Sequence, residues 1–517
     1  MEQSLMWLPP EVLLSILSIL DFRTLIKCRQ ICRKALDIID SSTSLKYKLH
    51  LGMNRLVDNN SGYSSQELLK KVQQHRDAWQ AFNYSNLLLF PCAGNAWELI
   101  GNVLATHVPG VGFTFHQIPS ALRGIQKNRW TVESAKIGVE VEDFSMDRSQ
   151  DLLVVLQAKR SQDDCLFLVH ILTMSGDKQP LAQRHVLEGV KLENDSEMLY
   201  DIRIFGNLLG VLFTAIESDI SILVIWNWKT GRIKKHVTGT MLELQTFILL
   251  TEDILMIGSL QIDGEPSPNL RVYHLDGEDY VANDILDSMA FLCVLTFPLP
   301  KHGVDVEIRL FSDPPPAKPN QNDGLFMTCH DDRLVVIGYD AYVSDTETEY
   351  YSSFVPLSSL MAIVERCLAA TDSEDTIIPH SEWAHHTEVT TSVLSDVWIS
   401  VVHGMRAITH EIDGTLVRAR ILDFNQYAIR QDLEEGRART SSYEIVGAET
   451  PAVRVNGKFL KDGDGYINSS LKQPYRVVSR DLPESIRENV TDLMLTEDSV
   501  VMVLKEVECE MFGILSF

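Results

Sequence analysis

The stretch that decides the first part of the fold is residues 8–51, LPPEVLLSILSILDFRTLIKCRQICRKALDIIDSSTSLKYKLHL. Pro9 and Pro10 suit the start of a helix, where a missing N–H costs nothing. Glu11 places negative charge in the first turn, where it complements the helix dipole. The aliphatic residues that follow recur at helical spacing and predict one broad apolar face: Val12, Leu13, Ile16, Leu17 and Leu20. Ile19 falls outside this stripe, so the helix is apolar on more than one side.

Two further short helices are predicted after the first. Asp21 is a suitable cap for a helix that carries Leu25, Ile31 and Cys32. A third helix holds Leu36, Ile38 and Ile39 and extends toward Leu45. Three short helices bury too little apolar surface to be stable alone. The segment therefore needs a covering surface, either the chain's own main domain or a second protein.

Two other roles for this segment are disfavoured. A signal peptide has its basic residues before the apolar run, whereas here Lys27, Arg29 and Arg33 follow it. Asp21 and Arg23 interrupt the run well short of the ~20 residues that a membrane span needs. We therefore expect no membrane partner.

The order of residues in this segment resembles the F-box motif: Leu-Pro-Pro-Glu-Val-Leu at 8–13, then Ile16-Leu17, Leu20-Asp21, Leu25-Ile26 and Arg-Gln-Ile-Cys-Arg at 29–33. F-box proteins are the substrate-receptor subunits of SCF-type (Skp–cullin–F-box) ubiquitin ligases. The resemblance implies a Skp-type adaptor and, through it, a cullin as partners. It also implies nine residues that build the contact surface and core for the adaptor, namely Leu8, Pro9, Glu11, Ile16, Leu17, Leu20, Leu25, Ile31 and Cys32. The sequence departs from the motif at Ala35, where a bulky residue is usual, and near Lys46, where a Trp is frequent.

Charge and cysteine content limit the classes of function. The formal net charge is −25, but the first 80 residues carry 11 Lys and Arg against 8 Asp and Glu. A slightly basic N-terminal module suits an acidic adaptor, and a strongly acidic body argues against nucleic-acid binding. The eight cysteines show no disulfide or zinc spacing. We expect a reducing location, cytoplasmic, nuclear or both. An acidic body also suits a basic client, although acidity alone is equally a property of a soluble surface.

The rest of the chain changes character. Residues 52–82 form a helical linker, with a short amphipathic helix that begins at Ser64 and ends near Trp79. From residue 83, apolar runs of four to eight residues alternate with turns rich in Gly, Asp, Asn, Ser and Pro, which predicts a mainly-β body. The only good internal helix is Leu357–Leu368. The expected domains are a helical module at 4–51, the linker at 52–82 and a client-binding domain at 83–517.

A loose internal repeat specifies the kind of β body. The clearest unit, residues 204–237, has three strand-like runs and a Trp-Asn-Trp-Lys-Thr-Gly turn, and 247–278 has the same layout. Four-stranded units at such a period are typical of a β-propeller, here of seven or eight blades. The unit resembles a degenerate WD-type blade. Paired β-sandwiches are the alternative. We expect 96–107 and Met511–Phe517 to close the ring, and tracts 313–320, 341–350 and 430–450 to be inserted loops.

Few residues predict bond chemistry. His380, His385 and His386 lack a fourth ligand at a metal-site spacing, and residues 462–467 read as a hairpin turn rather than a calcium loop. No nucleophile elbow, phosphate loop or His-Glu-x-x-His helix is present. We therefore expect no cofactor and no catalysis. The leading hypothesis is a substrate-recognition adaptor of an SCF-type ligase with an unidentified client. The rivals are a propeller scaffold that recruits no ligase and, with less support, an all-β enzyme.

Overall fold

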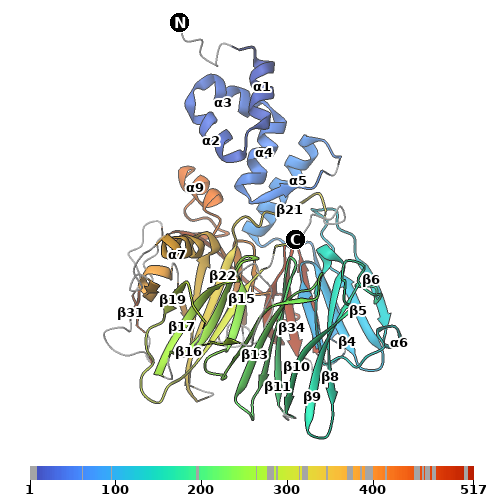
Figure 1. Ribbon diagram of the computed structural model, residues 1–517. Helices are drawn as coiled ribbons and strands as arrows, with labels where there is room; N and C mark the ends of the chain where they lie inside the picture. The colour runs from blue at the N-terminus through green and yellow to red at the C-terminus, as the bar shows by residue number, and fades with distance from the viewer. Residues whose placement is uncertain are drawn as a thin grey trace.

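A computed structural model describes the chain over residues 8–60, 62–92, 94, 96–193, 197–262, 265–275, 284–286, 289–313, 315–316, 324–344, 347–369, 376–384, 387–390, 400–413, 416–447, 454–456, 459, 466–468, 473–505 and 510–517. A helical module stands at one end of a ring of β-sheets (Figure 1). The ring is a β-propeller, and the helices lie on the end of it that also carries the C-terminus (Figure 1).

Four short helices make up the N-terminal module. They are α1 (Pro10–Ile19), α2 (Phe22–Ile31), α3 (Arg33–Ser41) and α4 (Thr43–Met53). Asp21 caps α2 by accepting a hydrogen bond from the Thr24 N–H at 3.0 Å. Ser42 interrupts the third predicted helix, because its side chain accepts from the Leu45 N–H and starts α4. Leu45 therefore belongs to a fourth helix and not to the end of the third.

The linker ties the module to the propeller. Strand β1 (Leu56–Asp58) pairs antiparallel with β21 (Phe326–Thr328), a short strand from the propeller. Helix α5 (Ser65–Ala81) begins directly after Ser64, which confirms the predicted start, and a capping box joins Ser64 to Glu67. Its buried residues face α4, the ribbon and the propeller: Leu68, Val72, His75 and Trp79.

The described strands form seven sheets of four or five strands, which are the blades, and two ribbons of two strands. The first four blades in chain order are as follows. Blade 1 has β3 (Ala96–Ile100), β4 (Val103–Val108), β5 (Gly112–Gln117) and β6 (Asn128–Glu133). Blade 2 has β7 (Asp143–Asp147), β8 (Leu152–Arg160), β9 (Asp164–Leu172) and β10 (Val186–Glu193). Blade 3 has β11 (Met198–Phe205), β12 (Leu208–Ala215), β13 (Ile220–Asn227), β14 (Arg232–Gly239) and β18 (Asp284–Ile285). Blade 4 has β15 (Thr246–Leu249), β16 (Ile254–Ile262), β17 (Glu265–His274), β19 (Cys293–Thr296) and β24 (Ile377–Ile378).

Three more blades complete the ring. Blade 5 has β20 (Asp305–Ser312), β22 (Leu334–Ser344), β23 (Glu347–Pro356) and β25 (Thr387–Thr390). Blade 6 has β26 (Val402–His403), β27 (Arg406–Asp413), β28 (Leu416–Asp423), β32 (Tyr475–Asp481) and β29 (Glu444–Val446). Blade 7 has β33 (Val490–Leu495), β34 (Ser499–Lys505), β35 (Glu510–Ser516) and β2 (Asn86–Cys92). The second ribbon pairs β30 (Arg454–Asn456) with β31 (Tyr466–Asn468). The remaining short helices are α6 (Ser134–Ile137), the 3-10 helix η2 (Arg148–Gln150), α7 (Leu357–Ala369), α8 (His380–Trp383) and α9 (Gln426–Glu434).

The ring closes between the two ends of the β body. Strand β2 pairs in register with β35, from Asn86 opposite Ser516 to Cys92 opposite Glu510. The expectation that residues 96–107 provide this strand is wrong, because those residues form β3 and β4 of blade 1. The expected C-terminal partner is confirmed. Each pair of neighbouring blades packs its facing side chains into an apolar cluster, so the core is a ring of interblade layers.

Four further expectations concern the rest of the β body. The tract 341–350 is not an inserted loop, because it contains the ends of β22 and β23. These strands pair from Leu334 opposite Pro356 to Ser344 opposite Glu347. Tract 430–450 is an insertion, between β28 and β32, and it contains the end of α9 and β29. Only residues 313, 315 and 316 of the proline-rich tract lie among the described residues. Helix α7 confirms the internal helix.

Candidate partner-binding surfaces

The nine residues assigned to adaptor binding divide into a core and a surface. Leu17 and Leu25 are buried with Ile39, Leu45 and Leu49 in the module's own core. Leu8, Ile16, Leu20 and Cys32 are partly exposed, and Pro9, Glu11 and Ile31 are exposed. The structure therefore places seven of the nine where a partner could touch them, while the two buried leucines hold the helices together.

An exposed apolar stripe follows the free side of α1. Pro9, Val12, Ile16 and Ile19 recur at three- and four-residue spacing, which places them on one helix face, and we call this set the α1 stripe. Val12 is 43% exposed and Ile19 is 80% exposed, and Ile31 at the end of α2 is 65% exposed. Val12 and Ile19 are absent from the nine residues. The signal was present in the sequence, because Ile19 lies off the stripe that the helix needs for its own core.

The two departures from the motif are accommodated differently. Ala35 is 1% exposed, so its small side chain stands in a closely packed place between α3 and the other helices. Lys46 is half-buried on α4. Ion pairs and hydrogen bonds join the helices as well: Arg29 of α2 meets Asp40 of α3 at 2.9 Å, and the Lys48 ammonium donates to the Ser18 carbonyl at 2.9 Å. The module therefore has a formed core at the altered position.

A buried polar cluster fixes α5 to the propeller. His75 Nε2 lies 3.1 Å from an oxygen of Asp498, and Arg123 donates to the other oxygen at 2.7 Å. Arg123 also donates to Glu497 at 2.5 Å and to the Phe326 carbonyl at 2.6 Å. Burial alone would raise the pKa of Asp498, but the charge of Arg123 and the hydrogen bonds hold that pKa well below its usual range. Burial lowers the pKa of His75, so the ring is neutral.

Apolar contacts reinforce the same joint. The Trp79 ring stacks on Phe517, with ring centroids 4.1 Å apart, and the Arg406 guanidinium lies over its face at 4.7 Å. Nearer the module, Phe22 meets Tyr427 of α9 edge to face at 5.0 Å. Gly52 leaves the room that Phe22 occupies, since a Cβ there would stand 2.2 Å from the ring. The module and the propeller are therefore joined through a packed interface.

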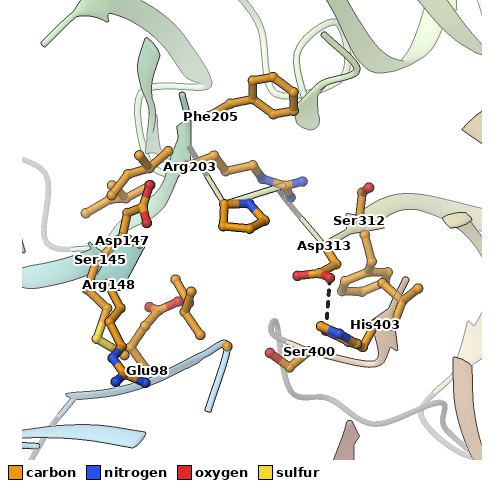
Figure 2. Close-up of a pocket in the computed structure, with 18 of the residues that line it drawn as sticks. Glu98, Ser145, Asp147, Arg148, Arg203, Phe205, Ser312, Asp313, Ser400 and His403 are labelled. Carbon is orange, nitrogen blue, oxygen red and sulfur yellow. Dashed lines mark ion pairs between the residues drawn. The ribbon is translucent and has the colours of Figure 1, made fainter. Parts of the chain in front are cut away.

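A central cavity of about 680 Å³ runs through the ring, and the first strands of the blades line it (Figure 2). At the end near the helices, Asp313 accepts from His403 at 2.9 Å and lies 3.7 Å from His330. Burial opposes the charge of Asp313, yet the two imidazoles and the Gly404 N–H lower the pKa of Asp313 to about 2. Burial likewise opposes a charged His403, but Asp313 raises its pKa above the ordinary value.

Carboxylates gather in the half of the cavity that faces away from the helices. Glu98 of β3, Asp143 of β7 and Asp201 of β11 line it on neighbouring blades. Arg203 is bound to Asp201, with Nε 3.0 Å from both carboxylate oxygens. Burial, together with Asp143 and Asp201, raises the pKa of Glu98 well above its ordinary value. Burial also raises the pKa of Asp143 to about 6, against a hydrogen bond from the Phe144 N–H.

These channel residues were not predicted as a site. Their signal is a charged residue inside the otherwise apolar first strand of a blade, as in Ala-Trp-Glu-Leu-Ile at 96–100. That signal appears only when the blades are known, because the strand order decides which runs line the channel.

The weaker candidates fall in several places. His380 is buried beside Trp383, and burial lowers its pKa to about 3. His385, His386 and residues 462–465 lie outside the described residues. Across the part of the chain that is described, no group of three or more His, Cys, Asp and Glu is placed to hold a metal ion. Within the same part, no helix is long and apolar enough to cross a membrane.

Comparisons with known proteins agree with this arrangement at the N-terminus. A model of the F-box domain matches residues 5–47. No curated protein matches the chain. Among solved structures, extracellular domains 1–2 of Drosophila Semaphorin 1b are similar with a TM-score of 0.35 and 8% sequence identity, over 84% of this chain and 87% of that chain.

The chain combines an F-box domain with a seven-bladed β-propeller. F-box domains generally bind a Skp-type adaptor. The combination fits a substrate-recognition adaptor, a class of protein that is typically not catalytic.

Proposed function

We propose that this chain is the substrate-recognition subunit of an SCF-type ubiquitin ligase. The F-box helices bind a Skp-type adaptor and, through it, a cullin, and the propeller binds the client. Residues 4–51 serve as the docking unit, 52–82 as the connection and 83–517 as the client-binding domain. The observation that carries the proposal is the exposed α1 stripe on a segment that matches the F-box domain.

Contact with an apolar partner surface would remove the α1 stripe from water and so stabilise the complex. A contiguous patch of exposed apolar residues is more often an interaction site than ordinary solvent-exposed surface. Ile19 is the most exposed large apolar residue among those described, and Ile31 is exposed nearly as fully as any other. Within the contact set we infer that Leu8, Pro9, Glu11, Ile16, Leu20, Ile31 and Cys32 touch the adaptor, together with Val12 and Ile19, while Leu17 and Leu25 support them.

The chain's contribution to ubiquitin transfer is proximity. An adaptor that holds a client near the ligase raises the effective concentration of the client's lysines, and other subunits carry out the transfer. A joint packed as closely as that of α5 favours a fixed separation between the docking helices and the client.

The test is copurification of a Skp-type adaptor with the full chain. Replacing both Ile19→Glu and Ile31→Glu places charges where the partner surface is apolar, and we expect adaptor binding to fall by about 100-fold or more. Leu181→Glu is the matched control, because Leu181 is 54% exposed and lies on the propeller. Full binding by the double variant would refute the assigned face, and absence of adaptor binding by the unaltered chain would refute the function.

A further inference from the structure

The cavity suggests what kind of client segment the propeller receives. We propose that the end of the channel facing away from the helices takes up a Lys or Arg side chain of the client, held by Glu98 and Asp143 between blades 1 and 2. This inference rests on the proposed function, since a client is what such an adaptor presents.

The direction of the strands identifies the end concerned. The first strand of each blade runs toward the helices; β33, for example, leads to the turn that holds Asp498 against His75. The turns between the second and third strands therefore lie at the opposite end, and Figure 1 shows the β8–β9 hairpin pointing away from the helices. Glu142, Met198 and Leu199 line the cavity at this end, so the cavity reaches it.

The carboxylates inside are short of positive charge. No hydrogen bond or ion pair joins Glu98 to any residue that the structure describes, and the nearby Arg203 is already bound to Asp201 through two oxygens. Burying a carboxylate without a partner is costly. The raised pKa values of Glu98 and Asp143 are consistent with this lack of nearby positive charge. An incoming ammonium or guanidinium group would supply that charge.

The cavity also has room for such a group. A volume of about 680 Å³ is within the range that binding pockets show. A Lys or Arg side chain is long enough to leave its main chain at the mouth while its charged end reaches inside.

The rim around blades 2 and 3 carries the same sign of charge. Exposed acidic residues stand on its turns and connections: Glu140, Asp163, Glu193 and Asp219. Two cations of this sector are paired, Arg160 with Glu142 and Lys191 with Asp164, which leaves Lys159 of the β8–β9 hairpin exposed. Such a field favours the approach of a basic segment and disfavours an acidic one.

The experiment compares the full chain with two variants that each replace one carboxyl group by an amide. Glu98→Gln neutralises the channel carboxylate with little change of shape, and Asp253→Asn neutralises an exposed residue in the β15–β16 turn, at the helix end. The probe is a short fluorescein-labelled peptide of repeating Gly-Ser-Lys units, followed by fluorescence anisotropy at physiological salt. The same peptide with Glu in place of Lys is the second probe.

We expect the lysine peptide to bind, the glutamate peptide not to bind, Glu98→Gln to weaken binding by about tenfold and Asp253→Asn to leave it unchanged. Equal affinity of both variants would mean that net charge alone attracts the peptide, and it would overturn the proposal. A lower melting temperature of Glu98→Gln would also overturn it, because it would show that Glu98 has a partner within the fold. Adaptor copurification is read on the same samples. If it fails while the peptide still distinguishes the variants, the proposed function falls and the channel site stands.

Discussion

Charged groups at the two ends of the channel are compensated differently. Near the helices, Asp498 is held by Arg123 and His75, and Asp313 is held by His403. At the far end, Glu98 has no such partner among the described residues and Asp143 accepts a hydrogen bond only from the adjacent Phe144 N–H. The first group contributes structure, and the second leaves a charge that a ligand could satisfy.

The pH dependence of stability should reveal the uncompensated carboxylate of Asp143. Its pKa in the folded protein is about 6, above the value near 3.9 of an unfolded chain. A raised pKa means that the stability it contributes is fully present below about pH 3.9 and is lost as the pH rises through 6. We therefore expect Asp143→Asn to be more stable than the unaltered chain at pH 7.5, by on the order of 1–2 kcal/mol, and the difference to shrink toward pH 5.

Thermal unfolding of both proteins across this pH range measures the effect. Asp253→Asn is the control, since Asp253 is exposed at the other end of the propeller. A constant difference between pH 5 and 7.5, or a less stable Asp143→Asn at pH 7.5, would show that the carboxylate is compensated in the fold.

Helix α5 is the element that joins the F-box helices to the propeller. Its first half packs on α4 and the ribbon, and its second half packs on blades 6 and 7. Trp79 contributes most of the second contact, because it stacks on Phe517 and is only 3% exposed.

Removing this ring should loosen the joint. We expect Trp79→Ala to lower the free energy of unfolding by about 3–5 kcal/mol and to speed cleavage by a protease between β1 and α5. Gln74→Ala on the exposed side of the same helix should change stability by less than about 0.5 kcal/mol. Limited proteolysis followed by mass spectrometry distinguishes the two variants. Equal cleavage rates would mean that the polar cluster alone holds the helix.

Elements that local contacts determine could be predicted from the sequence, whereas elements that depend on distant contacts could not. Ser64 and Glu67 indicate the start of α5, because they hydrogen-bond to each other's backbone, and the Trp-bearing turn of blade 3 indicates a hairpin. The closing strand could not be found in this way, since Asn86–Cys92 and 96–107 are both apolar runs and only pairing with β35 distinguishes them. The sequence of the β22–β23 hairpin predicts a loop, because its polar residues lie where the hairpin extends past the core.

The site residues follow the same division. The helical spacing and the resemblance to the F-box predict docking residues in the segment that the F-box model matches. Periodicity alone does not separate Leu25, which is buried, from Ile31, which is exposed. The channel carboxylates lie on three different blades, far apart in sequence. Only the closed ring brings Glu98, Asp143 and Asp201 to one cavity.

At the scale of the whole molecule, the chain has two working ends. The helices carry exposed apolar residues at one end, and the channel reaches the other end. The helices stand above one end of the propeller, with α5 between them and the blades (Figure 1). This arrangement suits a protein that holds two partners apart at a set distance.

The most direct measurement is light scattering during size-exclusion chromatography of the full chain coexpressed with a Skp-type adaptor. We expect one species with the mass of a one-to-one complex, which takes up a cullin when that subunit is added. Elution of the chain and the adaptor as separate species, with the chain folded, would contradict the proposed role as a ligase adaptor.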